Sequence, residues 1–118
     1  MNIITNPHML AKVRSSALTG HARGQPCALR LPGICNHLDA TTVFAHLPGI
    51  GKGVGSKVSD LHGAFACSSC HDAIDGRAPL RDLSGAIILD AMLRGLAETQ
   101  ARWVMAGLLV VPGGEVTK

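Results

Sequence analysis

The sequence predicts one small α+β domain that depends on a bound metal for its stability. With 118 residues, 14 glycines, six prolines and an aromatic set of two phenylalanines and one tryptophan, the chain offers a modest core and much loop. Four cysteines stand in two pairs and provide the staple that such a chain needs. We expect a single domain over residues 1–118, with its core in about residues 14–106.

Three elements are expected in the first half of the chain. Apolar residues at helical spacing predict a helix over 9–23. A short strand is predicted over 27–31. β-Branched and aromatic residues predict a second strand over 41–46, which ends on His46.

The second half is expected to hold one strand and two helices. A glycine-rich loop over 47–60 leads into a strand over 61–67 and then a short helix over 70–75. A long helix follows over 84–106. The apolar face expected to cover the core consists of Ile88, Met92, Leu96 and Trp103, with Leu89, Leu93 and Ala97 beside it.

The cysteines are expected to be reduced thiols. The first ten residues lack the basic start and apolar run of a secretory signal peptide, and no stretch of about 18 apolar residues could cross a bilayer. We therefore expect a cytoplasmic protein with no membrane partner. Disulfides rarely persist in the cytoplasm, so the four thiols favour a metal site over two disulfide bonds.

The spacing of the cysteines predicts a structural zinc. Cys67 and Cys70 are separated by two residues, the spacing that lets two thiolates face one ion. Cys27 and Cys35 form a looser pair, joined by a Pro-Gly turn. Four thiolates around one Zn²⁺ make a closed site, and closed sites are structural.

Other uses of the cysteines are open at this point. His37 could replace Cys35 as a ligand, and Cys27 or Cys35 could be an unliganded core thiol. Residues 67–71 also match the C-x-x-C-H motif of c-type haem attachment, which belongs outside the cytoplasm. A thioredoxin-like redox pair would need a βαβ setting, and the predicted elements contain none.

Two of the six histidines stand in settings that favour chemistry. His46 ends an apolar strand and opens the glycine-rich basic loop, although a simply packed or capping histidine is the plainer interpretation. His71 follows Cys70 directly, so its side chain should leave the zinc site in another direction and be available to a second ion. A neutral imidazole is well suited to take a proton near pH 7.

The order of these residues resembles the HNH endonucleases, a family with the ββα-metal fold. Two cysteines are followed by a strand that ends in histidine, then Asp-Leu, then a strand leading into Cys-x2-Cys-His on a short helix. Most of the chain is also similar to the small prophage-encoded nucleases of the YbcO type, and more distantly to the RecA-dependent nuclease Ref. The YbcO-like match runs from about Arg14 to Trp103 and includes Arg23-Gly24, Pro26-Cys27, Leu31-Pro32-Gly33, Cys35-Asn36, Ala45-His46, Asp60-Leu61, Ala66-Cys67-Ser68, Cys70-His71-Asp72 and Ile74-Asp75.

The resemblance implies a zinc-bound ββα-metal core, extended by an N-terminal helix and a long C-terminal helix, and roles for three residues. His46 would be the general base that activates water. Asp60 would orient this base or bind a catalytic divalent ion, Mg²⁺ or another, and His71 would be a ligand of the same ion. Such an ion neutralises charge on the scissile phosphate and the leaving oxygen.

Two positions depart from the HNH pattern. Many members carry an acidic metal ligand directly before the base, where this chain has Ala45, and the middle residue is Asp60 rather than asparagine. Charge at the ion would then come from Asp60, with Asp72 or Asp75 as further candidates. The alternative for Asp72 and Asp75 is a solvated helix face or an N-terminal cap.

Positive charge is concentrated in the first half. Residues 1–58 hold six basic side chains and one acid, whereas residues 59–118 hold five and seven, so the net charges are +5 and −2. A basic half is typical of phosphate-backbone binders, and equally of a solvated surface. The side chains expected to hold DNA phosphates without reading sequence are Arg23, Arg30, Lys52 and Lys57.

These observations predict a metal-dependent endonuclease that hydrolyses DNA phosphodiester bonds with little sequence preference. The alternative is a non-catalytic, zinc-stapled nucleic-acid-binding module, which Ala45 favours. A third hypothesis is a protein that binds a partner through its long C-terminal helix. The resemblance to Ref also implies a host recombination protein as a partner.

Overall fold

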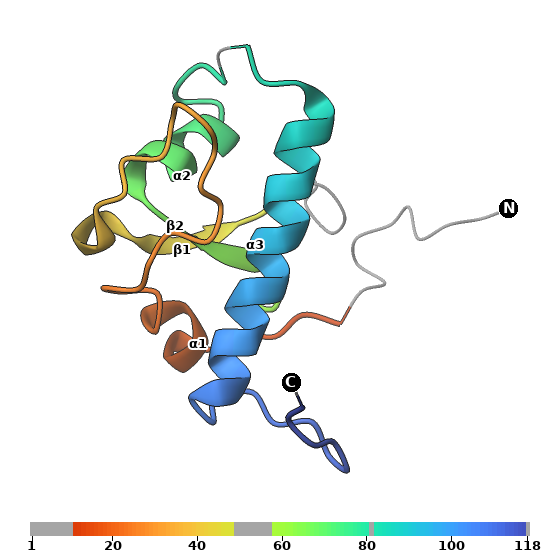
Figure 1. Cartoon of the computed structure of the whole chain (residues 1–118). Helices are drawn as coiled ribbons and strands as arrows, with labels where there is room; N and C mark the ends of the chain where they lie inside the picture. The colour runs from red at the N-terminus through yellow and green to blue at the C-terminus, as the bar shows by residue number, and fades with distance from the viewer. Residues whose placement is uncertain (1–10, 49–57, 81, 118) are drawn as a thin grey trace, which may run out of the picture.

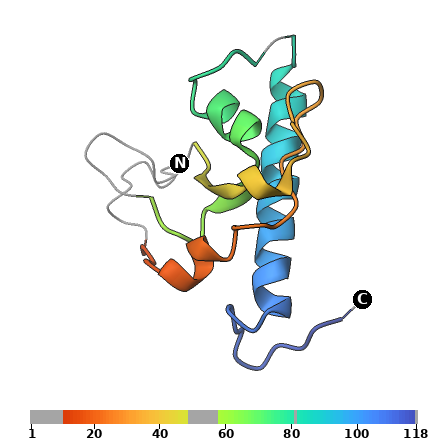
Figure 2. The same cartoon turned by 90° about the vertical axis from the view of Figure 1, so that its left-hand side faces the viewer.

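A computed structural model describes residues 11–48, 58–80 and 82–117 of the chain. Its elements are α1 (Ser16–Gly20), a 3-10 turn η2 (Asp39–Thr41), β1 (Val43–His46), β2 (Gly63–Ala66), α2 (Ser68–Ile74) and α3 (Gly85–Met105). The long α3 runs beside the sheet, with α2 next to its N-terminal half and α1 near its C-terminal end (Figures 1 and 2). The described chain is a small α+β protein, as the sequence predicts.

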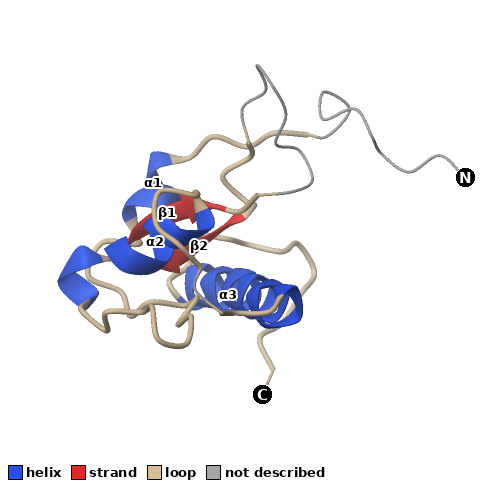
Figure 3. Cartoon of the chain, turned by 90° about the horizontal axis from the view of Figure 1, so that it is seen from above, coloured by secondary structure: helices blue, strands red, loops and turns tan. Residues whose placement is uncertain are grey.

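The strands β1 and β2 form a two-stranded antiparallel sheet, which lies between α1 and α3 when seen from above (Figure 3). Phe44 lies opposite Phe65, and His46 lies opposite Gly63. Only glycine fits at position 63, because a Cβ there would overlap the ring of Phe44 and lie 2.7 Å from the carbonyl oxygen of Ala45. Both strands lie where the sequence predicts them, and both are shorter than predicted.

The segment 27–31 does not form the predicted strand. Arg30 adopts a left-handed backbone conformation with a φ of 45°, which a regular strand does not accommodate. Both leucines of the segment are nonetheless buried. The backbone N–H of Ala28 donates a 2.7 Å hydrogen bond to the carbonyl of Phe65. The segment therefore covers the outer edge of β2 without extending the sheet.

The first helix is much shorter than the prediction of 9–23. It begins after Ser15, whose hydroxyl accepts a 3.2 Å hydrogen bond from the N–H of Leu18 and so caps the helix. Residues 11–15 are not helical, and residues 9 and 10 lie outside the described residues. The backbone before Ser15 is thus available for contacts with other parts of the chain.

The long helix α3 matches its predicted bounds closely. The hydroxyl of Ser84 accepts a hydrogen bond of 3.2 Å from the N–H of Ile87, and Gly107, with a φ of 75°, follows the last turn. Across the described ranges, neither α3 nor any shorter helix has the length and apolar character needed to span a membrane.

The buried face of α3 differs from the predicted one. Small residues face the core together with the predicted Trp103; the four buried positions are Ala91, Gly95, Thr99 and Trp103. A Cβ on Gly95 would lie 2.8 Å from Cδ2 of Leu29 and 3.2 Å from Cβ of Ala64, so the helix packs closely against the sheet. The larger apolar side chains are displaced to the flanks, where Ile88, Met92 and Leu96 are half-buried and Leu89, Leu93 and Ala97 are exposed.

Two groups of buried side chains make up the core. One contains the cysteines of α2 together with Ala45 and Ala64 of the sheet. The other gathers around Trp103, whose ring packs on Phe65 and whose indole N–H donates a 3.0 Å hydrogen bond to the carbonyl of Leu18. Alternate residues of the strands thus serve opposite faces of the sheet.

Candidate functional site

The four cysteines meet as the sequence predicts. Their Sγ atoms all lie within 4.8 Å of one another, and those of Cys35 and Cys67 are 3.8 Å apart. Thiolates on one tetrahedral zinc, with Zn–S distances of about 2.3 Å, lie about 3.8 Å from each other. Within 11–48, 58–80 and 82–117, this is the one place where three or more potential metal ligands gather so closely. The donor set and spacing fit a single ion.

Backbone amides near the cysteines point at the sulfurs. The Sγ of Cys67, which caps α2, accepts from the N–H of Cys70 at 3.4 Å and from that of Asn36 at 3.5 Å. The Sγ of Cys27 accepts from the N–H of Arg30 at 3.4 Å, in the turn where Arg30 is left-handed. Such hydrogen bonds stabilise thiolates, the form in which cysteine binds metal.

The second pair of cysteines is closed by a turn. Gly33 has a φ of 71°, and the N–H of Cys35 returns to the carbonyl of Leu31 at 2.9 Å. His37 lies beside Cys35 rather than in its place, because its exposed ring has Nδ1 3.7 Å from the Cys35 sulfur. All four thiols are free of disulfides. The geometry therefore favours the four-cysteine set over a set that includes His37.

The thiol pKa values show why a cation fits among the sulfurs. Burial raises the pKa of Cys35 to about 11. A hydrogen bond with Cys70 lowers the pKa of Cys27 to about 4, and the same bond, together with burial, raises that of Cys70. One thiolate is thus stabilised at the expense of its neighbours. Neighbouring thiolates repel one another. A cation at the centre would offset the repulsion between them and allow all four thiols to ionise.

His46 and Asp60 are brought together by the fold. The His46 Nε2 lies 2.9 Å from the Asp60 Oδ1. The carboxylate is buried, whereas the imidazole is 37% exposed at the end of β1. Its ring packs edge-on against Phe44, with ring centroids 5.1 Å apart. The imidazole is therefore held in place on two sides and open on another.

The Asp60 carboxylate has further donors from the N-terminal segment. The backbone N–H of Ser15 lies 2.8 Å from Oδ2, and the guanidinium of Arg14 lies 3.3 Å from Oδ1. Burial raises the pKa of Asp60, but the Ser15 N–H, His46 and the charge of Arg14 outweigh this, so the pKa lies below its ordinary value. Asp60 is therefore ionised at neutral pH.

His71 lies on α2 with a different set of partners. Its Nε2 is 3.0 Å from the carboxylate of Asp75, one helical turn on, and its Nδ1 is 3.4 Å from the guanidinium of Arg77. Arg77 also pairs with Asp75 at 3.1 Å and with Asp72 at 3.2 Å. Neither acid is the N-terminal cap of α2, because Cys67 holds that place, and Asp75 lies at the C-terminal cap of the helix. In the described chain, no metal-ligand group joins His71 to His46 and Asp60.

The four predicted phosphate contacts have different surroundings. Arg23 is exposed. The guanidinium of Arg30 instead makes a two-point ion pair with Glu98 of α3, at 2.8 and 2.5 Å, so a phosphate contact from it would require this pair to open. Lys52 and Lys57 lie outside the described residues. The set therefore stays a prediction, with Arg23 as its best-placed described member.

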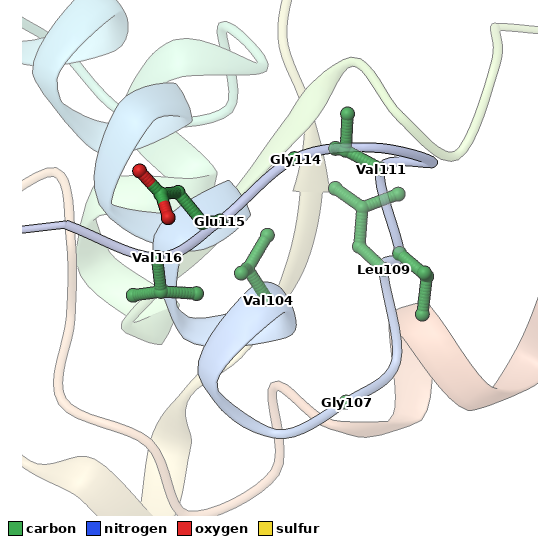
Figure 4. Close-up of a pocket in the computed structure, with 8 residues that line it drawn as sticks. Val104, Gly107, Leu109, Val111, Gly114, Glu115 and Val116 are labelled. Carbon is green, nitrogen blue, oxygen red and sulfur yellow. The ribbon is translucent and has the colours of Figure 1, made fainter.

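Two hollows among the described residues lie away from these polar groups. One, of about 440 Å³, lies between the end of α3 and the C-terminal tail and is lined mainly by valine and leucine, with Glu115 at its rim (Figure 4). An apolar groove of about 370 Å³ lies along α3 and is lined by Leu47, Pro48, His62, Leu89, Met92, Leu93 and Leu96. Neither contains His46, Asp60 or His71, so neither is taken as the reactive site.

Sequence reasoning missed Arg14 and Ser15 as partners of Asp60. The two segments are about 45 residues apart, and the helix predicted over 9–23 would have hidden the backbone of Ser15. Sequence reasoning also left open whether Asp72 or Asp75 is the partner of His71. The i, i+4 spacing of His71 and Asp75 on a helix was the signal available for that pair.

Fold and site together define a small α+β protein with a cluster of four cysteines that could hold a metal ion and a separate histidine–carboxylate pair. Comparison with known families makes the assignment specific. The family model described as "Putative nuclease YbcO" matches residues 16–108, and the chain belongs to this family.

Individual relatives agree with the family match. The chain is 42% identical over 89 residues to proteins named "Putative nuclease YbcO" from Escherichia coli K12 and from Enterobacteria phage 82; the match covers 75% of this chain and 91% of each relative. A solved structure described as a putative bacteriophage protein from E. coli K-12 matches with a TM-score of 0.62 and 36% identity. That match covers 75% of this chain and 98% of the solved one.

Proposed function

We propose that the protein is a metal-dependent endonuclease of the HNH type that hydrolyses DNA phosphodiester bonds with little sequence preference. The observation that supports this most strongly is the 2.9 Å contact between His46 and the buried carboxylate of Asp60. A histidine oriented by a carboxylate is a recurrent form of general base. The relatives named nucleases support the same class of reaction.

The contact assigns the two nitrogens of His46. An ionised carboxylate only accepts hydrogen bonds, so Nε2 of His46 carries the hydrogen that faces Asp60. Nδ1 then holds the free lone pair and is the atom that would take a proton from water. Phe44 and Asp60 together keep the ring from turning, so the base is oriented before substrate binds.

We assign His71 as a ligand of the catalytic divalent ion, Mg²⁺ or another, with Asp75 supplying negative charge beside it. When bound, such an ion neutralises charge on the scissile phosphate and the leaving oxygen. The carboxylate of Asp75 already lies 3.0 Å from the His71 ring. Arg77 contacts both side chains, and it would turn away to admit the ion.

The surroundings of Ala45 and Asp60 account for the departures from the HNH pattern. Ala45 is fully buried and lies opposite Ala64, so a carboxylate at this position would place a charge in the core. Asp60 uses one oxygen for His46 and Arg14 and the other for Ser15. We therefore favour the orienting role for Asp60 over a role as metal ligand.

We propose Zn²⁺ as the structural ion of the four-cysteine centre. Four thiolates with N–H···S hydrogen bonds are a donor set typical of structural zinc. Cys67 and Cys70 also fix the first turn of α2, so the same ion would anchor the helix that carries His71. The cytoplasm, where thiols stay reduced, suits such a site.

DNA is the proposed substrate and partner. Arg23 and the lysines of the glycine-rich loop, Lys52 and Lys57, would hold backbone phosphates, contacts that give affinity without sequence preference. A host recombination protein as a further partner is proposed only from the resemblance to Ref.

Plasmid nicking by the zinc-loaded protein tests the proposed function. We expect wild type to relax supercoiled DNA with Mg²⁺ or Mn²⁺. His46→Ala should remove activity while keeping zinc content and DNA affinity, and Asp60→Asn should lower the rate by about 10²–10⁴-fold through loss of an oriented base. Cleavage by His46→Ala at the wild-type rate would overturn the assignment of the base.

Two observations favour a second candidate, a DNA-binding module without catalysis. Ala45 supplies no acid, and Arg77 lies against both His71 and Asp75. The nicking assay separates the two functions. A wild-type protein that binds DNA and never cuts it with Mg²⁺, Mn²⁺, Ca²⁺ or Zn²⁺ would establish the binding module.

A further inference from the structure

A short segment before α1 runs alongside the residues that lead into β2. The N–H of Asp60 donates a 2.8 Å hydrogen bond to the carbonyl of Val13, and the N–H of Val13 donates one of 3.1 Å to the hydroxyl of Ser59. Arg14 also donates to the carbonyl of Val58. We call residues 13–15 the N-terminal clamp.

The clamp and His46 meet on one carboxylate. Asp60 Oδ1 lies 2.9 Å from His46 Nε2 and 3.3 Å from the Arg14 guanidinium, and Oδ2 takes the N–H of Ser15 at 2.8 Å. Donors on both oxygens fix the plane of the carboxylate. The orientation of the His46 ring therefore depends, through Asp60, on residues that precede Asp60 by about 45 positions.

We propose that Arg14 is a positioning residue for the His46–Asp60 pair. The N-terminal clamp then belongs to the catalytic site and is more than the segment that precedes α1. The proposal rests on the nuclease function proposed above. The family model matches residues 16–108, so the clamp lies outside the region that the family model covers.

Asp60 is buried, whereas the side chain of Arg14 is 46% exposed. Arg14 therefore brings a positive charge from the surface to a buried carboxylate. A buried carboxylate needs donors on its oxygens, and losing one leaves it free to turn toward another partner. If Arg14 is replaced by an uncharged side chain, we expect Asp60 to hold His46 less firmly. The ring would then sample both tautomers, and fewer molecules would present Nδ1 as the base.

Arg14→Met tests this proposal, with Lys12→Met as the matched control. Lys12 is exposed and stands two residues away, so its replacement removes the same charge from the same stretch without touching Asp60. The variants are compared, in the zinc-loaded full chain, by single-turnover cleavage of a labelled duplex, by DNA affinity, and by long-range ¹H–¹⁵N NMR of the His46 ring.

We expect Arg14→Met to cut about 10–100-fold more slowly than wild type at saturating enzyme, a range set by misplacement of a catalytic group. Its DNA affinity should change no more than that of Lys12→Met. The NMR spectrum should show the Nε2–H tautomer in wild type and Lys12→Met, and a mixture in Arg14→Met. Arg14→Lys should recover part of the rate.

Two results would overturn the proposal: an Arg14→Met protein that cuts at the rate of Lys12→Met, or one that loses affinity and keeps its rate. A wild type that never cuts would defeat the proposed function, and the NMR comparison would still decide whether Arg14 positions His46. If Arg14→Met fails to fold, Ser59→Ala loosens the other end of the clamp by removing the acceptor of the Val13 N–H. Ser59→Ala with wild-type rate and tautomer would count against the clamp.

Discussion

The hydroxyl of Thr99, in the middle of α3, accepts a 3.0 Å hydrogen bond from the backbone N–H of Phe65 in β2. Both residues are fully buried. The carbonyl of the same Phe65 is taken by the N–H of Ala28. The outer edge of β2 is therefore satisfied by a helix side chain and a loop instead of a third strand.

Thr99→Val should destabilise the protein by about 1–3 kcal/mol, because it leaves the Phe65 N–H buried without an acceptor while keeping the side-chain volume. Thermal unfolding at fixed zinc concentration measures this. Thr99→Ser keeps the hydroxyl and should cost less than Thr99→Val. The reverse order would show that packing, not the hydrogen bond, determines the identity of residue 99.

Replacing one ligand of each proposed ion should distinguish the structural ion from the catalytic one. Cys67→Ser should lose zinc and unfold the domain, because structural zinc contributes directly to folding. His71→Ala should keep its zinc and its circular dichroism spectrum and lose activity. Zinc content by mass spectrometry, together with the spectra, checks both. An unfolded His71→Ala protein would place this histidine on the structural ion.

The affinity of the four-cysteine centre for the proposed zinc should depend on pH. The four sulfurs must be thiolates to bind the ion, so apparent zinc affinity should fall as the pH is lowered and protons compete for the sulfurs. Competition with a chromophoric chelator at several pH values measures this. An affinity that does not change with pH would count against a four-thiolate site.

Gly95→Ala should destabilise the protein although alanine favours helices by about 1 kcal/mol. The new methyl would lie 2.8 Å from Leu29 and 3.2 Å from Ala64, both fully buried, and such overpacking costs about 1–3 kcal/mol. Gly85→Ala is the matched control on the same helix, because nothing lies within 4 Å of a Cβ there. It should be neutral or stabilising in the same denaturation experiment.

Arg77→Ala should make the proposed catalytic ion bind more readily. The Arg77 guanidinium contacts His71, Asp72 and Asp75, so its removal frees ligand atoms and leaves negative charge behind. We expect the Mg²⁺ or Mn²⁺ concentration for half-maximal cleavage to fall, and Arg77→Lys to stay near wild type. A rise in the required concentration would show that Arg77 supports the site instead of blocking it.

Local signals in the sequence predicted the cysteine cluster, the two strands and the ends of α3. Cys67 and Cys70 are separated by two residues and lie in one turn at the start of α2, and Ser84 and Gly107 mark helix ends through their own backbone preferences. These features depend on residues close together in the chain, so they can be recognised without knowing the fold.

The failures have a different physical origin. Residues 27–31 were predicted to be a strand, but they form a turn in which Arg30 is left-handed and its N–H donates to the Cys27 sulfur. The buried face of α3 was predicted from the helical spacing of its large apolar side chains, whereas close approach of the helix to β2 favours glycine and alanine. The contact of Arg14 with Asp60 joins distant segments and has no local signature.

The overlap between a Cβ at position 63 and the ring of Phe44 has an evolutionary consequence. Positions 44 and 63 cannot vary independently, because a side chain at 63 needs the space that the aromatic ring fills. Phe44 in turn packs against the imidazole of His46. Among relatives, we expect glycine at 63 wherever 44 is aromatic, and a joint change at both positions to accompany a change at position 46.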